Sequence, residues 1–319
     1  MSCQLYGWLS TDPPVLIHSL GDDIGHHLFD RPVIRFVTQM WHATVESIAG
    51  WHSDAVRRRP DDVIHHLAND PLLTRDLICR GIPATQVNSN AWVDERLFVP
   101  DELPARSFDA VYNARMVPFK RHWLAEHIRT PLFIGGIFAD DDRNEYLLEQ
   151  KQRMPHAEFV HGTNNRFLPS HEVAGLLNRA HVGLCLSALE GAMFAAIEYL
   201  LCGLPVVSTV NCGGRDVWFD PQYARTVPAD PTLIAAAVSE LIELRLSPTL
   251  IRNQTLCRIW DHRRRFLDLG QTIYSARGVG REFARDFYSN FTNKLGDWRP
   301  AEAVMHWYEE CRVRTISTR

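Results

Sequence analysis

The sequence predicts an α/β protein in which parallel strands alternate with helices. The first observation is the alternation itself, because short apolar or β-branched runs are separated by segments with helical spacing of apolar residues. The second is that the alternation occurs twice, before and after a break near residues 104–107. The third is the length of 319 residues, which fits two domains of about 150 residues each. Two Rossmann-like halves are therefore expected.

The expected strands of each half are short and apolar. In the first half they lie at residues 15–18, 33–38, 62–66 and 86–89. In the second half they lie at residues 109–113, 131–136, 157–162, 182–187, 205–209 and 224–227. Helical segments fill the intervals, and in the segment 170–180 we expect Ser170 to cap the helix start.

The predicted domain organisation follows from where this rhythm restarts and stops. Residues 1–106 form a shortened N-terminal Rossmann-like domain, and residues 107–284 form the second Rossmann-like domain. After about residue 284 the strands stop, and two helical segments are expected within 285–319. We expect these helices to pack back on the first domain.

Composition excludes several classes of protein. The chain is 45% hydrophobic and 23% charged, as in an ordinary globular protein. With 34 basic and 38 acidic residues, it lacks the positive charge that favours nucleic-acid binding. The seven cysteines form no C-x-x-C pair, and the most apolar stretch, 192–210, is interrupted by Glu198 and a Gly-Leu-Pro break. We therefore expect a cytoplasmic protein with reduced cysteines and no membrane span.

Several familiar motifs are absent from the sequence. The chain has no G-x-G-x-x-G after a first strand and no G-x-x-x-x-G-K-[ST]. A nicotinamide dehydrogenase and a P-loop NTPase are therefore disfavoured. The sequence also has no D-x-D motif between a strand and a loop, and Asp140–Asp142 is the nearest approach to one. We interpret this acidic run as a capping and surface feature.

The most informative segment runs from Leu186 to Val217. A strand ends near Ser187, a helix is expected over residues 191–202, and Gly203 then ends that helix as a C′ glycine. Helix starts at the carboxyl edge of a parallel sheet bind anions, and glycine lets the backbone approach a phosphate. Glu198 lies among apolar residues on that helix, where a buried acid needs partners. We expect it to accept hydrogen bonds from a ribose.

Two basic residues follow the strand at 109–113. Arg115 lies on the loop and Lys120 at the next predicted helix start, again at the carboxyl end of a strand. Their side chains can bind a diphosphate from the side opposite the helix expected to begin at Gly191. The pattern predicts a site for a nucleoside diphosphate.

These residues resemble a known family. Glu190 and Glu198, with seven residues between them, resemble the E-x7-E motif of GT-B glycosyltransferases, closest to glycosyltransferase family 4. Ser187 matches the small residue ahead of the first glutamate. Gly203-Leu-Pro205-Val matches the usual G-x-P-V, and Gly213-Gly214 matches the glycine pair of the next loop. The resemblance covers roughly residues 62–217.

The resemblance extends to earlier segments and also has departures. Arg115 and Lys120 resemble the family's arginine and lysine pair, and residues 87–100 resemble its interdomain segment. Met193 stands where the family often has a glycine, and the N-terminal glycine-rich loop is missing. His42 is the candidate for the family's histidine that faces the donor sugar.

The resemblance implies a GT-B fold and a retaining, hexosyltransferase-type glycosyltransferase that needs no metal and no cofactor beyond a nucleoside-diphosphate sugar. The implied catalytic residues are His42, Arg115, Lys120 and Glu190. The implied donor-binding residues are Gly135, Ser187, Gly191, Ala192, Met193, Glu198 and Gly214. The acceptor is left open as a glycan, a lipid or a small molecule. Alternatives are a nucleotide-sugar epimerase of similar fold and a catalytically silent nucleotide-sugar-binding module.

Overall fold

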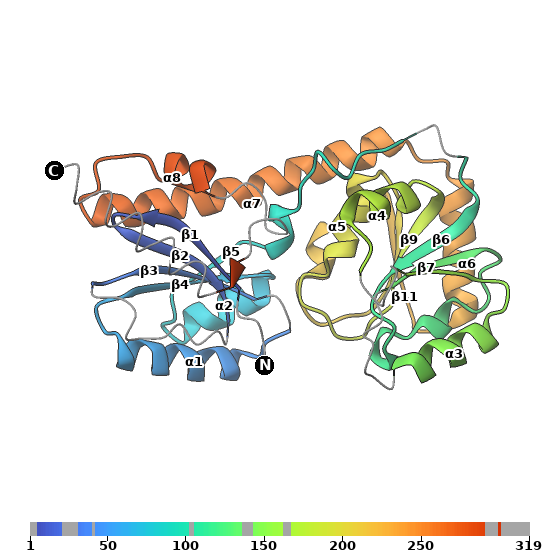
Figure 1. Ribbon diagram of the computed structural model, residues 1–319, viewed down its shortest axis with the longest axis horizontal. Helices are drawn as coiled ribbons and strands as arrows, with labels where there is room; N and C mark the ends of the chain where they lie inside the picture. The colour runs from blue at the N-terminus through green and yellow to red at the C-terminus, as the bar shows by residue number, and fades with distance from the viewer. Residues whose placement is uncertain are drawn as a thin grey trace. The chain divides into compact units, whose positions relative to one another are not determined.

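The protein is mixed α/β, with two sheets that each belong to a separate unit of the chain, as a computed structural model shows (Figure 1). The structure describes residues 5–20, 31–39, 42–101, 105–135, 143–161, 167–290 and 299–300. Unit 1 contains residues 1–93 and 259–319, and unit 2 contains residues 94–258. The predicted fold class, two domains with parallel sheets, is confirmed.

Unit 1 is built on a sheet with the strand order β12-β1-β2-β3-β4-β5. Its strands are β1 (Leu5–Thr11), β2 (Pro14–Ser19), β3 (Ile34–Thr38), β4 (Val63–Ala68), β5 (Ala84–Gln86) and β12 (Arg299–Pro300). Strands β2 to β5 are mutually parallel, whereas β1 pairs antiparallel with both β2 and β12. The N-terminal hairpin was not predicted. Strand β5 lies earlier than the expected 86–89, because after it the chain turns into a short 3-10 helix, η2 (Ser89–Trp92).

Helices cover both faces of this sheet (Figure 1). They are α1 (Val45–Arg58), α2 (Pro71–Cys79), the second half of α7 (Pro248–Ala276) and α8 (Phe283–Asn290). Aromatic rings join α7 and α8 to the sheet, since Phe266 packs edge-on against Phe36 at 4.9 Å between ring centroids and against Phe283 at 5.4 Å. This apolar cluster forms the core of unit 1 on the face of the sheet that α7 and α8 cover.

Unit 2 is built on a fully parallel sheet with the strand order β11-β10-β9-β6-β7-β8. Its strands are β6 (Phe108–Asn113), β7 (Pro131–Ile134), β8 (Glu158–Val160), β9 (Ala180–Cys185), β10 (Val206–Thr209) and β11 (Ala224–Val227). All six strands predicted for this half are thus confirmed. Its helices are α3 (Arg143–Arg153), α4 (Ser170–Leu177), α5 (Phe194–Leu201), α6 (Pro231–Glu243) and the first part of α7. Pro169, not Ser170, is the N-cap of α4, and no side chain caps it.

The units divide at different residues from the domains expected at 1–106, 107–284 and 285–319. The first boundary between the units lies between Val93 and Asp94, inside the segment 87–100. The second boundary lies between Arg258 and Ile259, within helix α7. The physical reason is that one long helix supplies residues to both units, and its apolar residues from Phe266 onward join the core of unit 1. The expected helix near the C-terminus lies outside the described residues.

Across the described residues, no helix is both long enough and apolar enough to cross a membrane.

Candidate functional site

The carboxyl ends of the parallel strands β6, β7, β9 and β10 meet at one edge of the sheet in unit 2. Ligands of open α/β sheets bind at this edge. The loop after β6 leads through a 3-10 turn, η3 (Pro118–Lys120), and the loop after β9 leads to α5. Most of the sequence-predicted site residues lie on these two loops.

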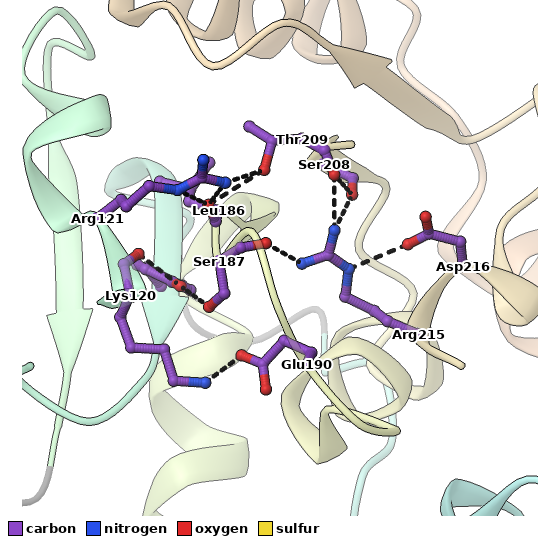
Figure 2. A network of polar contacts seen from close by, with 10 residues as sticks. Lys120, Arg121, Leu186, Ser187, Glu190, Ser208, Thr209, Arg215 and Asp216 are labelled. Carbon is purple, nitrogen blue, oxygen red and sulfur yellow. Dashed lines mark hydrogen bonds and ion pairs between the residues drawn. The ribbon is translucent and has the colours of Figure 1, made fainter. Parts of the chain in front are cut away.

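The structure brings Lys120 and Glu190 together in an ion pair (Figure 2). The side chains are 9% and 6% exposed, so both charges are buried. Lys120 is held from its backbone, because the Tyr112 hydroxyl donates to the Lys120 carbonyl oxygen at 2.9 Å. The Ser187 hydroxyl oxygen lies 3.0 Å from the same tyrosine oxygen, which connects the ends of β6 and β9.

Two arginines, Arg121 and Arg215, hold the start of the loop after β9 by hydrogen bonds (Figure 2). Arg215 is completely buried, and its guanidinium donates to the Ser187 carbonyl at 3.2 Å, the Ser208 hydroxyl at 2.9 Å and the Thr209 carbonyl at 2.7 Å. Arg121 donates to the Leu186 carbonyl and to the Thr209 hydroxyl, both at 2.7 Å. These bonds tie the end of β9 to the end of β10.

Gly213 and Gly214 let the loop after β10 pack directly against the loop after β9, which carries Glu190. Gly213 has a φ of 129°, and a Cβ at this position would overlap the carbonyl oxygen of Glu190. The Gly214 amide donates to the Gly191 carbonyl at 3.2 Å, and the Glu190 amide donates to the Cys212 carbonyl at 3.2 Å. The backbone of Glu190 is therefore held on both sides.

The helix expected to start at residue 191 begins three residues later, at Phe194. Met193 is its N-cap and has left-handed backbone angles, φ 49° and ψ 89°. Gly191 and Ala192 are buried loop residues and do not belong to the helix. The interpretation of Gly191 as the first residue of the helix is wrong, because the chain reverses its backbone angles at Met193 before the helix can begin. The C-terminal end agrees with the prediction, as Gly203 follows the helix with a φ of 73°.

Glu198 lies inside α5 and is 7% exposed. Its Oε2 accepts a hydrogen bond from the Asn113 side-chain amide at 3.0 Å. Burial raises the pKa of Glu198 to about 7, and the hydrogen bond from Asn113 offsets part of that rise. Asn113 is itself fixed, because its backbone amide donates to the hydroxyl of Tyr199 on the same helix at 2.5 Å. Glu198 thus lies against the carboxyl end of β6, as a buried acid with a polar partner.

The remaining predicted residues are distributed as follows. Arg115 is half-buried on the loop after β6, and its carbonyl accepts from the Val117 amide at 2.9 Å. Gly135 follows β7, where an added Cβ would lie 3.0 Å from the Ala114 carbonyl oxygen. His42 is exposed and belongs to unit 1. Its place relative to the donor-binding residues stays a prediction.

Sequence reasoning missed Asn113, Arg121 and Arg215. A polar residue at the end of a strand was the available signal for Asn113. Arg215 gave no signal, because an arginine after a glycine pair ordinarily lies at the surface. Arg121 adopts left-handed angles, with φ 55°, between two short 3-10 turns, and the pattern of apolar residues does not show this.

In the described ranges, no group of three or more His, Cys, Asp or Glu side chains is placed to hold a metal ion. Asp140–Asp142, the nearest approach to a metal-binding motif in the sequence, lies outside the described residues. Metal independence therefore stays a prediction.

Two α/β units built on sheets with parallel strands, one of which has buried charges at the carboxyl edge of its strands, have the architecture of Rossmann-like proteins. Residues 122–244 match the family described as glycosyl transferases group 1. No curated protein matches the chain.

Several solved structures share the fold. TarM of S. aureus superposes with a TM-score of 0.59 and 13% identity, over 82% of this chain and 55% of that one. HepE of Anabaena, solved in complex with UDP, gives 0.56 and 16%, over 73% and 68%. Sucrose-phosphate synthase from Thermosynechococcus elongatus gives 0.52 and 14%, over 91% and 69%. The fold is that of these GT-B glycosyltransferases.

Proposed function

We propose that the protein transfers a sugar from a nucleoside-diphosphate sugar to an acceptor, with retention of anomeric configuration and without a divalent metal. The observation that carries the proposal is the pair of buried acids at the carboxyl edge of the unit 2 sheet, one of them paired with a lysine. Supporting it, HepE, which shares the fold, is solved in complexes with UDP and with UDP-glucose.

The electrostatics of the edge suit a leaving diphosphate. Negative charge accumulates on that group as the glycosidic bond breaks, and fixed cations at the edge lower the barrier to this step. Lys120 is buried and its backbone is held by Tyr112, so its positive charge is anchored at this edge of the sheet. Arg115, on the same loop, supplies a second positive charge.

Two carboxylates suit the hydroxyl groups of the donor. We propose that Glu190 accepts from hydroxyls of the transferred sugar and that Glu198 accepts from the ribose. The burial of Glu198 excludes an ordinary solvent-facing helix position. His42 of unit 1 is proposed to face the transferred sugar. Retention is supported by the resemblance to family 4 alone.

The test begins with a thermal-shift panel of UDP-, GDP-, ADP- and TDP-sugars. A ligand at a hundredfold excess over its Kd stabilises the folded protein by about 2.7 kcal/mol. The donor that binds is then incubated with candidate acceptors, and NMR reads the anomeric configuration of the product. Isomerisation of the sugar without an acceptor would favour an epimerase, and binding without transfer or hydrolysis would favour a silent module.

A further inference from the structure

The ion pair between Lys120 and Glu190 has a consequence for the selectivity of the site. Both side chains are buried, and Glu190 is the acid with which Lys120 forms its ion pair. Its ammonium lies 5.2 Å from the centroid of the Phe119 ring. The neighbouring His122 is kept neutral, since burial and then the charge of Lys120 lower its pKa to about 3. Glu190 is thus the anion that balances Lys120.

We propose that Glu190 discriminates against a free diphosphate by competing with it for Lys120. This inference rests on the proposed function, in which Lys120 meets the donor diphosphate. A phosphate that takes Lys120 leaves the Glu190 carboxylate buried without its counter-charge, which is unfavourable. A diphosphate that still bears a sugar compensates the carboxylate with hydroxyl hydrogen bonds. A free diphosphate has no such donors.

The backbone of Glu190 cannot move away to relieve this competition. Its amide is bonded to the Cys212 carbonyl at 3.2 Å, and Gly213 packs against its carbonyl oxygen so closely that no Cβ fits. Arg121 and Arg215 hold the preceding residues of the loop. The carboxylate therefore stays within reach of Lys120, so that after sugar transfer it regains the lysine and weakens the hold on the diphosphate product. Glu190 thereby favours the sugar-bearing donor over the product.

The test uses inorganic pyrophosphate, which carries neither base nor sugar. Isothermal titration calorimetry compares the wild type with Glu190→Gln, which keeps the shape of the side chain and removes its charge. We expect pyrophosphate to bind the variant about tenfold more tightly or better, equivalent to 1.4 kcal/mol. Combining Glu190→Gln with Lys120→Met should abolish the gain. Glu243→Gln is the matched control, because it removes an exposed carboxylate outside the site and should leave pyrophosphate binding unchanged.

The outcomes separate this inference from the proposed function. Equal or weaker pyrophosphate binding by Glu190→Gln, or a gain that persists without Lys120, overturns the competition even if a nucleotide sugar binds the wild type. The second case is a gain in pyrophosphate affinity that requires Lys120, while no nucleotide sugar of the thermal-shift panel stabilises the wild type. That result supports the competition between Glu190 and the diphosphate, but it contradicts the proposed donor. If Glu190→Gln does not fold, Glu190→Asp, which keeps the charge but shortens its reach, should show a smaller gain in the same direction, and no gain there also overturns the inference.

Discussion

Replacing Glu198 with glutamine should stabilise the fold while weakening the donor site. Burial raises the pKa of Glu198 from its ordinary value of 4.5 to about 7. A carboxyl whose folded-state pKa is raised contributes stability that is fully present below pH 4.5 and is lost as the pH rises through about 7. At 1.36 kcal/mol per pH unit, the loss amounts to about 3 kcal/mol. Glutamine does not titrate and still accepts from Asn113.

The assay is chemical unfolding of the wild type and of Glu198→Gln between pH 4 and pH 8.5, with the difference between the two taken at each pH. We expect the difference to move by about 3 kcal/mol in favour of the variant from pH 4 to pH 8.5. Glu243→Gln, on the exposed face of α6, should shift stability by less than about 0.5 kcal/mol at every pH. A difference between wild type and Glu198→Gln that is flat with pH would refute the buried, titrating carboxyl.

The same variant should bind the nucleoside diphosphate more weakly by roughly ten- to hundredfold, because a hydrogen bond to a charged group contributes about 1.5–3 kcal/mol. Calorimetry with the free nucleoside diphosphate measures this loss. Unchanged affinity would remove Glu198 from the donor site, and its buried charge would then have no functional explanation. Stability and affinity are thus expected to change in opposite directions.

Three further changes test the rest of the site. Lys120→Ala should lower turnover by about 10²-fold or more, a larger factor than its effect on donor affinity. The exposed Lys151→Ala should leave turnover unchanged. Activity that EDTA abolishes and Mn²⁺ restores would contradict stabilisation of the diphosphate by protein charges alone. His42→Ala should lower turnover in a transfer assay and leave nucleotide binding nearly intact, while a joint loss of binding and thermal stability would identify a packing residue. Gly213→Ala should reduce both donor affinity and melting temperature, because its Cβ would overlap the loop that carries Glu190; wild-type values of both would contradict the close approach.

The position of the site could be predicted from the sequence because strand order and strand direction constrain it strongly. The segment that ends shortly before Arg115 and the segment that contains Val182 are both predicted as strands of one parallel sheet. Their carboxyl ends must therefore lie at the same edge of that sheet. Lys120 and Glu190, 70 residues apart, meet there for that reason. The apolar surroundings of Glu198 likewise indicated a buried acid, and the structure has it buried.

Local backbone geometry could not be predicted in the same way. Nothing in the residue pattern around Met193 shows the left-handed angles that delay the start of α5, since a methionine rarely adopts them. The complete burial of Arg215 depends on three acceptors that come from two different strand ends. The unit boundary within α7 depends on which core each half of that helix joins, and a continuous helical pattern carries no mark of the change.

The site separates the groups that hold its shape from the groups proposed to bind the donor. Arg121 and Arg215 bond mainly to backbone carbonyls and hydroxyls, and these bonds do not involve the carboxylates of Glu190 and Glu198. Lys120 is likewise held through its carbonyl oxygen, which leaves its ammonium able to exchange one anion for another. Since these bonds do not depend on the carboxylates, we expect the loops to keep their positions when the charges change partners. Substitutions that keep side-chain shape, such as Glu190→Gln and Glu198→Gln, should therefore change the electrostatics of the site without rearranging its loops.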